Sequence, residues 1–134
     1  MHPDIRFCLT QCRTIAVVGL SPKPHRDSHR IAQYMQAHGY RIVGVNPAAK
    51  EVLGEPCYPS LSEAAAHERI DLVNCFRNAE DIPPIVTEAM AVGAKAVWMQ
   101  LGIAHAGAAA QARAAGLVVV EDRCLKVEHA ALDR

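Results

Sequence analysis

The chain has 134 residues, of which 51% are hydrophobic and 21% charged, and 14 basic residues balance 14 acidic ones. This length is typical of one domain that buries roughly two-thirds of the surface its unfolded chain exposes, so we expect residues 1–134 to form a single domain. The balanced charge argues against nucleic-acid binding, and no apolar run reaches the roughly 18 residues of a membrane helix. The first residues lack the apolar centre of a signal peptide, so we expect a cytoplasmic protein.

Five short runs rich in valine and isoleucine predict β-strands. Several are apolar on consecutive residues, which is typical of strands covered on both faces, as in a parallel sheet. In chain order the runs are 14–20, 41–46, 71–76, 95–99 and 117–121.

Helical stretches with recognisable ends lie between and around these runs. The second is expected to begin at Asp27 or Ser28, and Ser60 and Glu63 have the spacing of a capping box at the start of the third. The predicted helices cover 4–12, 27–39, 60–68, 80–93, 105–116 and 125–132.

This alternation of strand and helix predicts an α/β fold, a three-layer αβα Rossmann-like domain with a doubly wound parallel sheet of about five strands. Ligands of such sheets bind beyond the carboxyl ends of the strands, where the strand order reverses. We therefore expect the functional residues in the turns that follow the strands.

The first of these turns, in "VVGLSPKPHRDSHR" (17–30), has the features of an anion site. Gly19 permits a tight turn, and a helix that begins near Asp27 presents unpaired N–H groups and a positive dipole end. The residues expected to donate hydroxyls or positive charge to a phosphate are Ser21, Ser28, Lys23, Arg26 and Arg30. The alternative interpretation is a solvated surface loop, in which such charge clusters are common.

The dinucleotide-binding fingerprint G-x-G-x-x-G is absent from this turn. Ser21 stands where the second glycine would be, and the second predicted strand ends in Asn46-Pro47, with Lys50 beyond, instead of an acidic residue. A cation such as Lys50 after the second strand suits a ligand whose ribose carries a phosphate, so NADP or coenzyme A fits this sequence better than NAD.

Several blocks in order resemble the small stand-alone CoA-binding domain proteins, which are related to the N-terminal CoA-binding domain of the succinyl-CoA synthetase α subunit. The blocks are "VVGLSPKPHRDSHRIAQYM", "GYRIVGVNPAAKEVLG", "DLVNCFRNAED", "EAMAVGAKAVWMQLGI" and "AGLVVVEDRCLKVE". The resemblance implies a CoA or acyl-CoA site. Its implied parts are the loop Gly19, Leu20, Ser21, Lys23 and Pro24 at the diphosphate, Asn46, Pro47 and Lys50 at the adenosine 3′-phosphate, Phe76 and Arg77 as a wall, and Met99 and Gln100 toward the pantetheine.

The chain departs from the resembling proteins in two respects. Asn78-Ala79 follow Phe-Arg where the family commonly has an arginine or a serine, so we carry no ligand contact over to these two positions. The synthetase's phosphohistidine domain and β subunit have no counterpart in the 134 residues, and no histidine is paired with an evident nucleophile and acid. We therefore expect binding rather than ligase activity.

The five cysteines are odd in number and form no CxxC pair, which predicts reduced thiols. Cys8 and Cys12 share a helix face but make a poor zinc site without a second pair. Cys124 follows the last predicted strand and has two interpretations, a packed thiol or a thiol that forms a mixed disulfide with CoA.

Three functions are consistent with the sequence. The first, which we favour, is a non-catalytic or regulatory module that binds CoA or an acyl-CoA. The others are an NADP-dependent oxidoreductase and an interaction subunit that has lost its ligand, and no protein partner is indicated.

Overall fold

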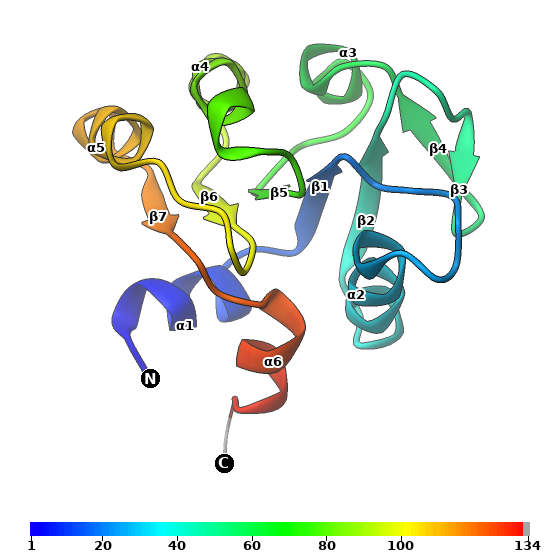
Figure 1. Cartoon of the computed structure of the whole chain (residues 1–134), viewed down its shortest axis with the longest axis horizontal. Helices are drawn as coiled ribbons and strands as arrows, with labels where there is room; N and C mark the ends of the chain where they lie inside the picture. The colour runs from blue at the N-terminus through cyan, green and yellow to red at the C-terminus, as the bar shows by residue number, and fades with distance from the viewer. Residues whose placement is uncertain (133–134) are drawn as a thin grey trace.

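A computed structural model, which describes residues 1–132, shows one central sheet between two layers of helices (Figure 1). The strands are β1 (Thr14–Val18), β2 (Arg41–Val45), β3 (Glu51–Val52), β4 (Glu55–Tyr58), β5 (Leu72–Cys75), β6 (Ala96–Met99) and β7 (Val118–Val120). The helices are α1 (Pro3–Thr10), α2 (Asp27–Ala37), α3 (Leu61–Ala65), α4 (Ile82–Ala91), α5 (Ala106–Ala114) and α6 (Leu125–Ala130), with a 3-10 turn η1 (Ala79–Asp81) before α4. None of these helices has the length and apolar character of a membrane-spanning segment.

The strand order is β3-β4-β2-β1-β5-β6-β7, and every pair is parallel except β3 with β4. From β1 the chain passes to β2 on one side, and it later returns to add β5 on the other side. The strand order therefore reverses between β1 and β5. The prediction of a doubly wound α/β sheet is confirmed, and the seven strands exceed the predicted number of about five.

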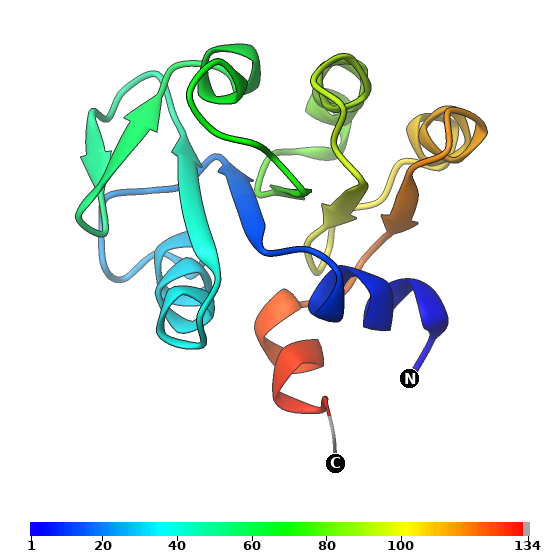
Figure 2. The same ribbon diagram turned by 180° about the vertical axis from the view of Figure 1, so that it is seen from behind.

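The two strands that the sequence reasoning missed form a hairpin at one edge of the sheet, opposite β7 (Figure 2). Leu53 and Gly54 both have positive φ, 56° and 77°, as a two-residue hairpin turn requires. Each strand has only two to four residues, and β4 contains Pro56, so no apolar run marks them. Their turn was the only available signal, and it carries a leucine where asparagine or aspartate is usual.

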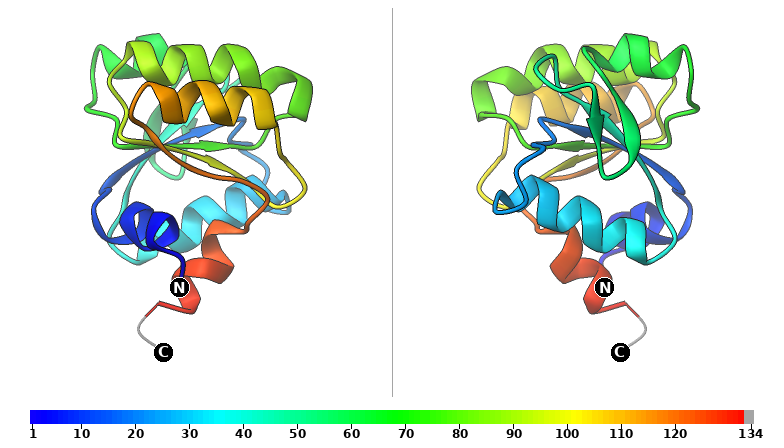
Figure 3. Two further views of the ribbon diagram at one scale, coloured as in Figure 1. Left: turned by 90° about the vertical axis from the view of Figure 1, so that its left-hand side faces the viewer. Right: turned by 90° about the vertical axis from the view of Figure 1, so that its right-hand side faces the viewer.

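The two faces of the sheet are covered by different helices. α3, α4 and α5 lie on one face and α1, α2 and α6 on the other, as the two edge views in Figure 3 show. Fully buried side chains fill both interfaces, for example Val73 and Met99 in the first and Ile15 and Trp98 in the second. This packing makes the carboxyl ends of β1 and β5 a rigid frame for the loops that follow them.

The predicted starts of the second and third helices are confirmed. α2 begins at Asp27, and the Ser60 hydroxyl accepts the Glu63 N–H at 3.1 Å in front of α3. The first helix ends at Thr10, two residues before the predicted end.

Candidate functional site

The turn after β1 rests directly against the turn after β5. The N–H of Gly19 donates to the carbonyl of Val45 (2.9 Å), and the N–H of Phe76 donates to the carbonyl of Val18 (2.9 Å). Gly19 has φ +92°, and a Cβ built on it would lie 2.7 Å from the Phe76 carbonyl oxygen. Glycine is therefore required at the point where the strand order reverses.

Asn46 holds the loop that follows Gly19. Its side-chain Nδ2 donates to the carbonyl of Leu20 (2.9 Å), and its Oδ1 accepts the N–H of Ala48 (2.9 Å). Leu20 itself is fully buried in the core. The end of β2 thus positions the β1 loop, and the Asn46 side chain is engaged with backbone groups.

The first turn of α2 fastens the same loop from its other side. The Ser28 hydroxyl oxygen accepts the N–H of Ser21 (3.0 Å), and the Ser21 hydroxyl oxygen accepts the N–H of Lys23 (3.1 Å). Nδ1 of His29 lies 3.0 Å from the Ser21 carbonyl oxygen. Each serine hydroxyl still has its own hydrogen to donate, because in these contacts its oxygen only accepts.

The cations of the loop differ in what they contact. Arg30 donates to the Asp27 carboxylate and to the carbonyl of His25, so its charge is already paired. Lys23 and Arg26 are exposed and form no ion pair within residues 1–132. These two side chains are the free positive charges at the N-terminus of α2.

Two cavities open beside these loops. One, of about 420 Å³, is lined by Gly19, Ser21, Arg26, Asp27, Ser28 and Phe76, and we call it the cradle. The other, of about 520 Å³, is lined by Asp27, Arg30, Ile31, Phe76, Arg77, Asn78, Ala79, Gln100, Leu101, Gly102, Ile103, Cys124 and Lys126, and we call it the chamber. They share Asp27 and Phe76, so together they form one cleft from the β1 loop to the start of α6.

The structure places the predicted site residues in four groups. In the cleft walls are Gly19, Ser21, Arg26, Ser28, Phe76, Arg77 and Gln100. Buried in the core are Leu20 and Met99, and exposed on the loops are Lys23, Pro24 and Lys50. Pro47 lines a separate cavity of about 290 Å³ toward α3 and α4, and Asn46 holds the β1 loop.

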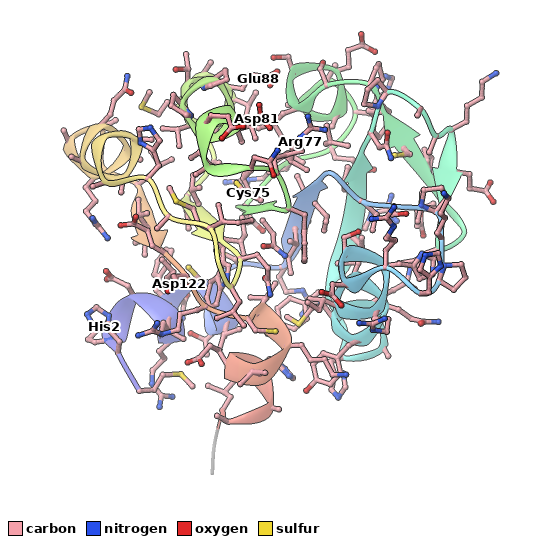
Figure 4. All side chains as sticks on the ribbon, viewed as in Figure 1. His2, Cys75, Arg77, Asp81, Glu88 and Asp122 are labelled. Carbon is pink, nitrogen blue, oxygen red and sulfur yellow. The ribbon has the colours of Figure 1, made fainter. Side chains whose placement is uncertain are left out.

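Arg77 is shared between the chamber and that third cavity. Its Nε lies 3.6 Å from the Asp81 carboxylate, and the two side chains point toward one another above the end of β5 (Figure 4). Asp81 therefore pairs with the arginine that forms this wall of the cleft.

Several chamber residues were not predicted as site residues. Asn78 and Ala79 line it directly after Phe76-Arg77, and Ile31 and Lys126 come from α2 and α6. The first two follow a strand end, which was a usable signal. The helical residues carried none, because a single sequence does not reveal which helix turns border a cleft.

The cysteines divide by burial. Cys8, Cys12, Cys57 and Cys75 are buried, and burial raises the pKa of each thiol, that of Cys12 to about 11. Cys124 is half-buried and lines the chamber.

Comparison with known proteins adds a family match. A family model described as "CoA binding domain" matches residues 13–130. The uncharacterized protein YneT of Bacillus subtilis is 39% identical over 127 residues, covering 95% of this chain and 93% of that protein. A structure of a hypothetical protein from Pyrococcus horikoshii OT3 superposes with a TM-score of 0.90 at 40% identity, covering 96% of this chain and 89% of that one.

A more distant relation reaches a large enzyme. The ADP-forming acetate–CoA ligase I of Archaeoglobus fulgidus is 32% identical over 76 residues, which are 57% of this chain and 11% of the ligase. The similarity therefore covers one small part of that enzyme.

Proposed function

The chain belongs to the CoA-binding domain family, and from this premise we propose that it binds coenzyme A or an acyl-CoA as a single domain. The observation that carries the proposal is the joining of the cradle and the chamber at Asp27 and Phe76. A ligand with a charged diphosphate at one end and a long, mostly uncharged arm fits a cleft that has these two parts.

In this proposal the diphosphate lies in the cradle. The first amides of α2 have no partners within the helix, and the side chain of Arg26 at its N-cap forms no capping hydrogen bond. A phosphate in the cradle would accept hydrogen bonds from these amides and from the hydroxyls of Ser21 and Ser28. The free charges of Lys23 and Arg26 would balance its negative charge.

The pantetheine arm then extends into the chamber. Phe76 and Ile31 offer it apolar surface, and Gln100 and Cys124 lie at the end toward α6. Met99 does not line the chamber, because its side chain is buried in the core between the sheet and α3, α4 and α5, so any effect of Met99 on the arm is indirect. Lys50, with Asn46 and Pro47, is proposed for the adenosine 3′-phosphate, and Asn46 would act there by holding the loop at Leu20.

We propose binding without turnover, and a regulatory role. The cradle and the chamber, as lined by residues 1–132, include no histidine or glutamate, and their one aspartate, Asp27, is paired with Arg30. A cleft whose lining has neither a histidine nor an unpaired carboxylate suits recognition more than general acid–base catalysis by those groups.

Isothermal titration with CoA, dephospho-CoA, NADP and NAD at two salt concentrations tests the proposal. We expect saturable CoA binding that weakens as salt rises, and weaker binding of dephospho-CoA, because it lacks the 3′-phosphate. Tighter binding of NADP than of CoA would favour the oxidoreductase. Binding of none of the four would favour an interaction subunit.

A further inference from the structure

Cys124 is placed unlike any other cysteine of the chain. It lies half-buried in the wall of the chamber, whereas the other four thiols are buried in the core. Lys126, from the first turn of α6, lines the same cavity. A molecule in the chamber would therefore meet one accessible thiol.

Gln100, beside Cys124, points independently to a ligand in the chamber. It is only 5% exposed, and its Oε1 accepts the N–H of Leu125 at 3.3 Å. Its Nε2 has no acceptor within residues 1–132, yet Gln100 lines the cavity. Within residues 1–132 only the Asn74 side chain has fully enclosed polar atoms without a partner, so Nε2 of Gln100 is open to the cavity, where the amide carbonyls of a pantetheine arm are suitable acceptors.

Two hydrogen bonds hold the segment that precedes Cys124. Asp122, at the turn after β7 (Figure 4), has φ 55°, and its Oδ1 accepts the N–H of Gly102 at 2.7 Å. The carbonyl of Arg123 accepts the indole N–H of Trp98 at 2.8 Å. These bonds tie the segment to β6 and its following loop, so the thiol stays at the chamber wall.

We propose that Cys124 forms a reversible mixed disulfide with CoA held in this cleft, and the proposal rests on the CoA binding proposed above. The co-reactant is the disulfide of CoA. Cys124 loses its proton to solvent, and the thiolate attacks one sulfur of the CoA disulfide. The bond between the two CoA sulfurs breaks as the new S–S bond forms, and the second CoA leaves as a thiolate that takes up a proton. No further oxidant is needed, and a thiol reductant reverses the step.

The test is intact-protein mass spectrometry, with peptide mapping, after incubation with CoA disulfide and an acid quench. We expect one CoA adduct, located on Cys124, that disappears on addition of dithiothreitol. At equal concentrations it should form at least about tenfold faster than the adduct of cystamine, a small disulfide without nucleotide, because binding raises the local concentration. Cys57→Ser should retain the adduct, and Cys124→Ser should lose it.

A parallel titration with reduced CoA in the presence of dithiothreitol tests CoA binding separately from mixed-disulfide formation. Binding of reduced CoA, with no adduct on Cys124 from CoA disulfide, would overturn the mixed disulfide and leave CoA binding intact. If reduced CoA does not bind, and if CoA disulfide and cystamine form their adducts at equal rates, both proposals are overturned. An adduct that maps to another cysteine would also overturn the assignment.

Discussion

Gly19 and Phe76 approach so closely that a Cβ on the glycine would lie 2.7 Å from the phenylalanine carbonyl oxygen. Gly19→Ala should lower the free energy of unfolding by about 2–4 kcal/mol, because it adds a strained φ of +92° to a backbone clash. The variant should also bind CoA more weakly, since relief of the clash moves the loop of the cradle. Urea unfolding followed by the fluorescence of Trp98, the chain's one tryptophan, measures the first effect.

Gly39→Ala is the matched control. Gly39 also has φ +92°, but a Cβ there would have no heavy atom within 4 Å. We expect a loss of only about 1 kcal/mol, from the backbone strain alone, and unchanged CoA binding. Equal losses in the two variants would mean that the contact with Phe76 is unimportant.

The sequence predicted the strands and the helix start that surround the site better than the hydrogen bonds between its side chains. The ends of β1 and β5 were found because strands buried on both faces have apolar runs, and the start of α2 because Asp27 and Ser28 favour helix N-termini. The Asp27–Arg30 pair has the i, i+3 spacing of neighbours on a helix surface, so the sequence offered a signal for it. The hydrogen bond from Asn46 to Leu20 joins residues that are distant in the sequence, and no spacing rule expresses it.

Asn74, in the middle of β5, should be replaceable with a gain in stability. Its side chain is fully buried, and neither Oδ1 nor Nδ2 has a hydrogen-bond partner within residues 1–132. Asn74→Leu removes these unpaired groups and keeps the branching and the number of heavy atoms of the side chain, so the free energy of unfolding should rise by about 1 kcal/mol. Chemical denaturation provides the measurement.

Asn46→Leu is the contrasting substitution. It removes the two hydrogen bonds to Leu20 and Ala48, so stability should fall by about 1–3 kcal/mol. A stability loss in Asn74→Leu like that in Asn46→Leu would show that the Asn74 amide forms hydrogen bonds in solution.

The charges proposed to meet the diphosphate make a separate prediction. Lys23→Ala with Arg26→Ala should raise the Kd for CoA at low salt at least about tenfold and flatten its salt dependence, because each lost charge removes a charge-assisted contact. Arg6→Ala with Arg69→Ala changes the net charge equally at exposed positions outside the cleft linings. Calorimetry should find the control unchanged. Equal weakening in both variants would mean that the effect is one of net charge.

The stability of the protein should fall as the pH drops through about 6.5 because of His129. Burial, together with the nearby His38, lowers the pKa of His129, whose Nδ1 lies 2.9 Å from the Tyr34 hydroxyl. The unfolded chain therefore takes up this proton at a higher pH than the folded one, which favours unfolding in acid. His129→Gln should flatten the dependence of the unfolding free energy on pH between 7 and 5. His25→Gln, at an exposed loop position, should retain the pH dependence of the wild-type protein. If His129→Gln also leaves the pH dependence of the unfolding free energy unchanged, His129 is not its cause.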